Sequence, residues 1–281
     1  MRGGGEWVKE RYTEEIDAVI AYIHQHLDEP LPLVRLAKYV NYSPFHFSRI
    51  FKERTGLSPL YYVSSVRLHK AKALLLNTNL SVRDVAMEVG QQSLGTFTTR
   101  FSEKVGVTPA NFRQSAQKAE ELVHALKNLE EWPLSPTSIG WNVRVEGTVT
   151  TEVSTEGVIL IGLFTKPIPE GLPAYGTLLA SPGPFRFENV KPGVYYLMAT
   201  SISWGMQSKE ILLPQTTLRG RLMDPVIVRP WTETPPLKLT LHGPRLDDPP
   251  ILISLPLLMN NFLNRIGRTG KGSFTGASLR T

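Results

Sequence analysis

A pattern of apolar, glycine and proline residues occurs twice in the first 115 residues of the chain. The copies are offset by 49 residues before a turn and by 50 after it, so the second copy has one additional turn residue. The matched residues are Leu33, Leu36, Ala37, Val40, Phe47, Phe51, Gly56, Ser58, Pro59 and Tyr62, followed by Val82, Val85, Ala86, Val89, Phe97, Phe101, Gly106, Thr108, Pro109 and Phe112. Such a repeat indicates two copies of one supersecondary unit.

Each copy has the pattern of two short helices joined by a turn. In Leu33–Val40 the apolar residues fall at i, i+3, i+4 and i+7, which makes one face of a helix. Ser43 followed by Pro44 predicts a second helix, with serine as N-cap and proline at the first helical position. The second copy restarts in the same way at Ser93, after residues 90–92. The sequence therefore predicts two helix-turn-helix units.

The segment between the copies, Leu60–Asn77, predicts one continuous helix. A helix of this length extends over about 27 Å, at 1.5 Å per residue. With the flanking helices added, the second helices of the two units could lie about 34 Å apart, which is one turn of DNA. The sequence leaves one structural alternative open, in which the two hairpins are parts of a helical bundle and their phenylalanines only fill its core.

Positive charge is concentrated in the repeat. Residues 33–113 contain 12 Lys and Arg against 4 Asp and Glu, which gives +8, whereas the whole chain has a net charge of +6. This distribution is typical of a module that binds a polyanion. The chain contains no cysteine, which excludes disulfides, thiolate catalysis and cysteine-bound zinc. We expect no metal, cofactor or membrane segment, and a cytoplasmic location.

The repeat resembles the DNA-binding domain of the AraC/XylS family of bacterial transcription regulators. The resemblance covers about Ile16–Arg113. The residues that carry it are Ser43–Lys52, Gly56–Pro59, Val85–Gly90, Phe101, Gly106, Thr108, Pro109, Phe112 and Arg113. It implies a sequence-specific regulator of transcription, more often an activator, that binds double-stranded DNA.

On the first recognition helix, the resemblance implies that Phe45, Ser48 and Arg49 face the major groove. The Arg49 guanidinium can donate two hydrogen bonds to guanine O6 and N7. The alternatives for Arg49 are a phosphate contact or an ion pair with Glu53 at i+4. His46 lies beside the inward-facing Phe47 and is expected to pack or to contact phosphate.

Other basic residues are expected to contact phosphate or to remain solvated; these are Lys38, Lys52, Arg54 and Arg83.

The second recognition helix departs from the family. Its groove-facing positions hold Leu94, Gly95, Thr96 and Thr99, where members often have Gln or Arg, and Gln91 replaces a usual aromatic residue. Short side chains can touch a thymine methyl group or a phosphate, but they cannot make bidentate base contacts. Arg100 is the one long basic side chain nearby, and it could reach the backbone instead. We expect this helix to anchor DNA more than it discriminates bases.

From Gly140 onward the chain is expected to be all-β. Short alternating segments between Gly and Pro residues predict a β-sandwich. These segments are Asn142–Val149, Val158–Phe164, Phe185–Val190, Val194–Thr200, Leu218–Met223 and Leu237–Leu241. Residues Gly183–Leu197 resemble the transthyretin-like, carboxypeptidase-regulatory type of sandwich. The predicted organisation is a DNA-binding domain at 10–115, a connecting helix and linker at 116–136, a β-sandwich for an effector or for dimerisation at 137–262, and a basic flexible tail at 263–281.

The sequence leaves several functional alternatives open. Aromatic residues of the second domain could line an effector pocket or fill the sandwich core; they are Trp141, Trp204, Trp231, Tyr175, Tyr195 and Tyr196. RNA polymerase, a small-molecule effector and a second copy of the chain are candidate partners. The alternative function is an architectural or recruiting DNA binder whose β domain holds a protein partner. An enzyme is not expected, since the repair proteins that share this module need a nucleophilic cysteine.

Overall fold

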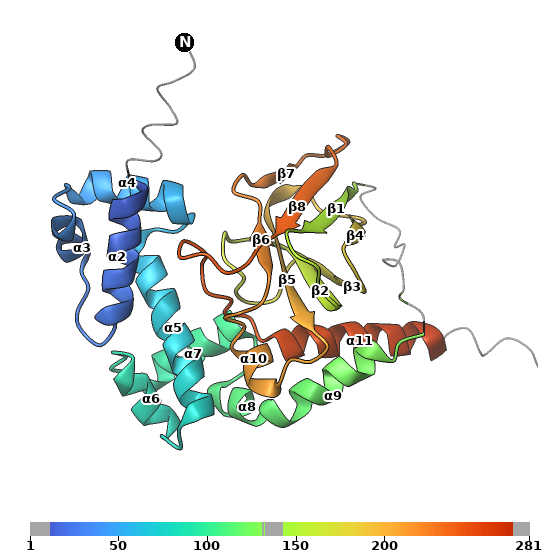
Figure 1. The fold of residues 1–281 in the computed structure, drawn as a ribbon, viewed down its shortest axis with the longest axis horizontal. Helices are drawn as coiled ribbons and strands as arrows, with labels where there is room; N and C mark the ends of the chain where they lie inside the picture. The colour runs from blue at the N-terminus through green and yellow to red at the C-terminus, as the bar shows by residue number, and fades with distance from the viewer. Residues whose placement is uncertain (1–11, 131, 133–142, 272–281) are drawn as a thin grey trace, which may run out of the picture. The chain divides into compact units, whose positions relative to one another are not determined.

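The computed structural model describes residues 12–130, 132 and 143–271, which form two compact units (Figure 1). Unit 1 contains the residues up to Arg113 and two segments from later in the chain, Lys166–Gly171 and Pro244–Ile253. Unit 2 contains Gln114–Thr165, Leu172–Gly243 and the residues from Ser254 onward. Helices dominate unit 1 and strands are concentrated in unit 2, which confirms the expected two-domain α+β organisation.

The described helices up to residue 114 follow the predicted order. They are α2 (Thr13–Gln25), α3 (Leu33–Tyr39), α4 (Pro44–Thr55), α5 (Pro59–Asn77), α6 (Val82–Glu88), α7 (Leu94–Val105) and α8 (Pro109–Gln114). The pairs α3–α4 and α6–α7 are the two helix-turn-helix units. Helix α5 connects them without a break, and its 19 residues extend over about 29 Å. In Figure 1, α4 lies near one end of α5 and α6 near the other.

The repeat is visible in the core of unit 1 as two similar aromatic clusters. The Phe47 ring lies 5.5 Å from Phe51, which lies 5.4 Å from Tyr62. In the second copy, Phe101 lies 5.7 Å from both of its partners, Phe97 and Phe112. All six rings are buried. The phenylalanines are therefore core residues, as the alternative of a helical bundle also required. Evidence for DNA binding must come from the exposed residues instead.

The boundaries of the second domain require a correction. Residues 166–171 and 244–253 belong to unit 1, although the sequence placed them within a single domain at 137–262. The two segments are hydrogen-bonded to each other, because the Pro169 carbonyl accepts the N–H groups of Leu252 and Ile253, both at 3.0 Å. Sequence periodicity could not reveal this, since both segments are irregular loops.

Two sheets make up most of unit 2. The strands are β1 (Val145–Thr151), β2 (Gly157–Phe164), β3 (Tyr175–Leu179), β4 (Gly183–Phe187), β5 (Gly193–Ser203), β6 (Arg219–Arg221), β7 (Val226–Val228) and β8 (Leu237–Leu241). One sheet has the order β4-β1-β8, and the other has β3-β2-β5-β6 with β7 also paired to β5. Strand β1 is antiparallel to β4 and parallel to β8. The chain therefore passes from one sheet to the other between β4 and β5.

Side chains of both sheets contribute to one hydrophobic core, which includes Val145, Ile161, Phe187, Leu197 and Leu239. Every residue of β2 is buried, which accounts for its unbroken apolar sequence. The sequence predicted six of the strands to within a few residues, but β3 and β7 were missed. Both are short, so alternation has too few positions to be recognised.

The expectation of an all-β second domain also requires a correction. Unit 2 contains α10 (Ser208–Leu212) and α11 (Leu255–Lys271), which were not predicted, and α9 (Ala116–Lys127), which lies in the segment expected to be a connecting helix. The three helices pack against one another, and α11 also contacts β3. Buried Leu255, Met259 and Phe262 lie at helical spacing on α11. The helix continues through residues 263–271, which the sequence assigned to a flexible tail.

The aromatic residues suggested for an effector pocket are dispersed. The Tyr175 and Tyr195 rings form an edge contact at 5.9 Å, and both hydroxyls bond the backbone of Lys191, before β5. Trp231 is 85% exposed, and Trp141 lies outside the described residues. The two tyrosines therefore hold the connection between the sheets.

Within the described ranges, no helix combines the length and apolar character that a membrane crossing requires.

Candidate nucleic-acid interface

Helix α4 buries one face in the core and exposes the other face in its N-terminal half. The Ser43 hydroxyl accepts the His46 N–H at 3.3 Å, and Pro44 occupies the first turn, as predicted. Gly56 ends the helix with a φ of 76°, a conformation that favours glycine. Buried Phe47 and Phe51 fix the inner face. The outer face near the N-terminus is thus positioned by caps and core together.

The outer face of α4 carries the residues expected to contact DNA. Phe45 is 84% exposed, which is unusual for an aromatic side chain and is explained if a partner covers it. Arg49 and Lys52 are exposed, and Ser48 is partly exposed on the same helix. His46 is different, because its ring packs 4.9 Å from the Tyr42 ring and 5.6 Å from the Tyr12 ring. His46 therefore packs against these rings, and its contact with phosphate remains a prediction.

Arg49 is paired within its own helix. Its Nη1 lies 2.8 Å from Glu53 Oε1, and the two side chains are 52% and 61% exposed. An exposed pair at i,i+4 contributes only about 0.3–0.5 kcal/mol. A bidentate contact with guanine is worth about 1–3 kcal/mol of discrimination, so the pair presents a small barrier to base contact. Base contact by Arg49 remains a prediction.

Helix α7 repeats the construction of α4 with smaller outward side chains. The Ser93 hydroxyl accepts the Thr96 N–H at 3.3 Å, and Gly106 ends the helix with a φ of 86°. Phe97, Phe101 and Val105 form the buried face. The exposed residues are Leu94, Gly95, Thr96, Thr99 and Arg100. The predicted contacts are therefore accessible on α7, and Arg100 is the long basic side chain among them.

The basic residues around the two helices differ in availability. Lys38 and Arg83 are exposed, as a phosphate contact requires. Arg54 requires a correction, because its guanidinium lies 2.9 Å from Asp247 and 3.6 Å from Asp17. Its charge is thus used inside unit 1, in an arrangement that depends on a residue almost 200 positions away in the sequence. The described residues contain no cluster of His, Cys, Asp or Glu suited to a metal ion.

Comparison with known proteins agrees with this architecture. Residues 36–115 match a family model described as a helix-turn-helix domain. The chain is 36% identical over 110 residues to the uncharacterized HTH-type transcriptional regulator YobQ of Bacillus subtilis, covering 39% of this chain and 46% of the relative. Residues 36–115 therefore form a helix-turn-helix domain.

Two further proteins resemble this helix-turn-helix domain. The bifunctional transcriptional activator/DNA repair enzyme AdaA of Bacillus subtilis is 38% identical over 108 residues, which cover 38% of this chain and 51% of AdaA. The C-terminal domain of AraT, a response regulator from Geobacillus stearothermophilus, is 31% identical, with a TM-score of 0.35 and coverage of 37% of this chain and 88% of that domain. The chain thus spans about half the length of the two curated relatives.

Two arginines to which the sequence analysis assigned no role hold the helix-turn-helix domain together. On α5, Arg67 donates to the carbonyls of Leu27 and Glu29, at 3.0 and 2.6 Å. At the other end, Arg113 donates to the carbonyls of Leu75 and Leu80. Both arginines bond backbone carbonyls of segments distant in the sequence, so residue type does not reveal the contact. The sequence analysis therefore did not single out Arg67, and it named Arg113 only as part of the family motif.

Proposed function

We propose that this chain is a sequence-specific transcription regulator whose helices α4 and α7 contact two successive major grooves of one DNA duplex. The observation that carries the proposal is the equal construction of the two helices. Each has a serine N-cap, a buried pair of phenylalanines and a left-handed glycine cap, and each leaves outward residues of its N-terminal half exposed. If these helices served only to form the core, exposure of the apolar side chains of Phe45 and Leu94 would have no explanation.

Charge and geometry support the same proposal. The net charge of +8 on residues 33–113 suits a polyanionic partner. Helix α5 is about 29 Å long, close to the 34 Å that separates successive major grooves on one face of DNA. Phosphate contacts by Lys38, Lys52 and Arg83 would place the protein on the duplex, and Arg49 would discriminate bases.

The relatives favour regulation of transcription over a solely architectural role. The names of YobQ and AdaA both describe transcription proteins, and that of AdaA specifies an activator. We propose activation here too, with RNA polymerase as a partner. We do not extend the repair activity named for AdaA to this chain, whose 281 residues include no cysteine for alkyl transfer. Its match with AdaA also covers only half of that protein.

For unit 2 we propose a transthyretin-like sandwich that holds an effector or a second copy of the chain. The change of sheet between β4 and β5 supports it, because a chain that crosses between two sheets with one shared core is typical of sandwiches. The Tyr195 hydroxyl, which donates to the Lys191 carbonyl at 3.0 Å, fixes this crossing.

Selection of bound sites from a random duplex library with the full chain tests the proposed function. We expect a motif with two parts, separated centre to centre by about 10–10.5 base pairs. Binding without any sequence preference would favour the architectural alternative, and failure to bind duplex DNA at low salt would exclude both. Transcription of the neighbouring genes with and without the protein then separates an activator from a recruiting protein.

A further inference from the structure

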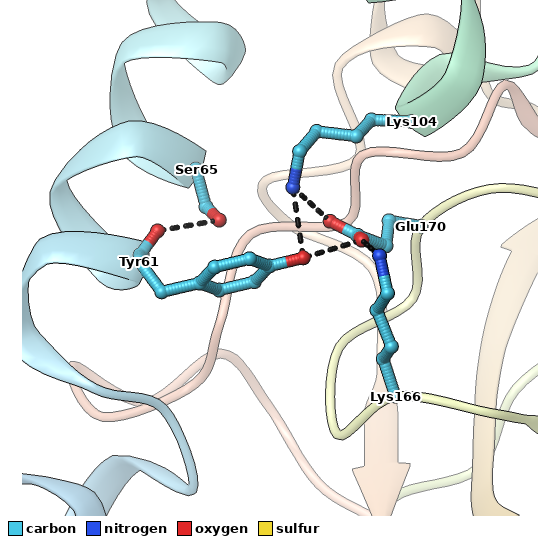
Figure 2. Close-up of polar contacts among 5 residues, drawn as sticks. All are labelled: Tyr61, Ser65, Lys104, Lys166 and Glu170. Carbon is cyan, nitrogen blue, oxygen red and sulfur yellow. Dashed lines mark hydrogen bonds and ion pairs between the residues drawn. The ribbon is translucent and has the colours of Figure 1, made fainter. Parts of the chain in front are cut away.

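Glu170 is a buried carboxylate with three donors around it, all within unit 1 (Figure 2). Its side chain is 3% exposed. Lys104 Nζ lies 2.6 Å from Oε2 and Lys166 Nζ lies 2.7 Å from Oε1, to which the Tyr61 hydroxyl also donates. Burial alone would raise the pKa of the Glu170 carboxyl, but the hydrogen bonds outweigh it and lower the pKa. The carboxylate is therefore charged, and both of its oxygens accept hydrogen bonds.

Two of the three donors to Glu170 come from helices of the proposed DNA-binding domain, α7 and α5. Lys104 lies in the last turn of α7, and Tyr61 lies in the first turn of α5. Lys104 Nζ also donates to the Tyr61 hydroxyl at 2.8 Å and lies 4.1 Å from the centre of its ring. Burial and the Glu170 hydrogen bond raise the pKa of Tyr61, so its hydroxyl stays a donor. Glu170 thus joins α7 to α5 through one carboxylate.

A backbone contact next to Glu170 reinforces the join. The Gly171 N–H donates to the Lys104 carbonyl at 2.7 Å. The last four carbonyls of a helix have no partner inside the helix, so this bond caps the end of α7. Gly171 has a φ of 61°, and a Cβ at this position would lie 3.1 Å from the Glu103 carbonyl oxygen. The position therefore favours glycine for both conformation and space.

The second segment extends the same network to α4. Pro169 accepts two backbone N–H groups from Leu252 and Ile253. On α5, buried Lys72 donates to the carbonyls of Ile251 and Leu252, at 3.0 and 3.2 Å.

In the same segment, Asp247 pairs with Arg54 in the last turn of α4. We call residues 166–171 and 244–253 together the brace. Within unit 1, the brace contacts the C-terminal turns of both recognition helices and two points on the helix that connects them.

We propose that the brace sets the placement of α7 relative to α4, with Glu170 as its positioning residue, and that it thereby fixes the half-site spacing that the protein accepts. The inference rests on the proposed function. One base pair inserted between half-sites moves the second half by 3.4 Å and rotates it by about 35°. A helix held at its C-terminal end by a buried ion pair and a backbone cap cannot follow such a shift, whereas a helix released from them can.

The test compares the full chain with its Glu170→Gln variant, which keeps the side-chain size and removes the charge. For each protein, Kd is measured on the selected site and on the same site with one base pair inserted. We expect Glu170→Gln to reduce the spacing preference about fivefold to tenfold, as loss of orienting charge-assisted hydrogen bonds implies. Glu103→Gln is the matched control, because it removes the same charge from an exposed position adjacent to Lys104. It should keep the wild-type preference.

The outcomes separate the brace from simpler explanations. If Glu170→Gln binds both spacings more tightly by an equal factor, Glu170 only masks the charge of Lys104, and the positioning role is wrong. If wild-type protein selects no two-part site, the proposed function fails instead. Tyr61→Phe removes one donor and keeps the ring, and it should reduce the preference in the same direction by a smaller factor.

A measurement without DNA tests the brace independently of the proposed function. Hydrogen exchange of the free full-length protein should accelerate several-fold in Glu170→Gln at residues 101–106 and 166–171, and it should stay unchanged in α3. Unchanged exchange at residues 101–106 would overturn the proposal. Circular dichroism of each variant confirms that the fold is retained before either comparison.

Discussion

At the scale of single residues, Arg49 and Lys52 are expected to have different roles on the same helix. Arg49→Ala should weaken the best site by about 1–3 kcal/mol and relax base preference at one position, because a bidentate contact with guanine is lost. Lys52→Ala should weaken all sequences alike and reduce the dependence of affinity on salt, because a phosphate contact releases counterions. Kd values on a set of single-base variants at two salt concentrations separate these effects.

Glu53→Gln provides the control for Arg49, because it breaks the ion pair and leaves the guanidinium in place. It should leave base preference unchanged. If Arg49→Ala keeps the wild-type base preference, Arg49 contacts phosphate and does not discriminate bases.

Lys72 is expected to make stability depend on pH. It is completely buried, and burial lowers the pKa of its amino group from 10.5 to about 7. Between these values the unfolded chain binds a proton that the folded chain does not, so the free energy of unfolding rises with pH by up to about 1.4 kcal/mol per unit. The effect of Lys72 is fully destabilising below pH 7 and disappears above pH 10.5.

Urea denaturation of Lys72→Met at pH 7, 8.5 and 10 measures this dependence. Relative to wild type, the variant should become less stable as the pH rises through this window. Lys38→Met, which removes an exposed lysine, is the control and should run parallel to wild type. A constant difference between wild type and Lys72→Met would show that the Lys72 amine is charged in the folded protein throughout.

At the scale of elements, α4 and α7, the two proposed recognition helices, differ in their exposed side chains. Helix α4 exposes Phe45 and Arg49, whereas α7 exposes Gly95, Thr96 and Thr99 near its N-terminus. We therefore expect the selected motif to have one sharply defined half and one poorly defined half. The second half should still contribute to affinity, because phosphate contacts supply much of the binding free energy without discriminating bases.

Substitution of all four bases at each position of both halves checks this prediction. If the half that faces α7 discriminates as strongly as the half that faces α4, then water-mediated contacts or DNA shape supply specificity that the side chains do not indicate.

The elements also show where sequence patterns suffice. The starts of α4 and α7 were predicted, because the serine caps Ser43 and Ser93 act locally. The extent of α11 was not predicted, because its apolar stripe becomes favourable only when α9 and β3 cover it. Short strands such as β7 depend in the same way on a neighbouring strand.

At the scale of the whole molecule, the sequence by itself determined the repeat, the order of its helices, the position of the positive charge and the outward residues of α4 and α7. These features follow from local periodicity and capping, which act over fewer than about 20 residues. Only the tertiary structure decided that residues 166–171 and 244–253 belong to unit 1 and that Arg54 and Lys104 are paired rather than free for DNA. Contacts between irregular segments and distant helices leave no period in the sequence, because a single buried carboxylate such as Glu170 looks like any surface glutamate until its neighbours are in place.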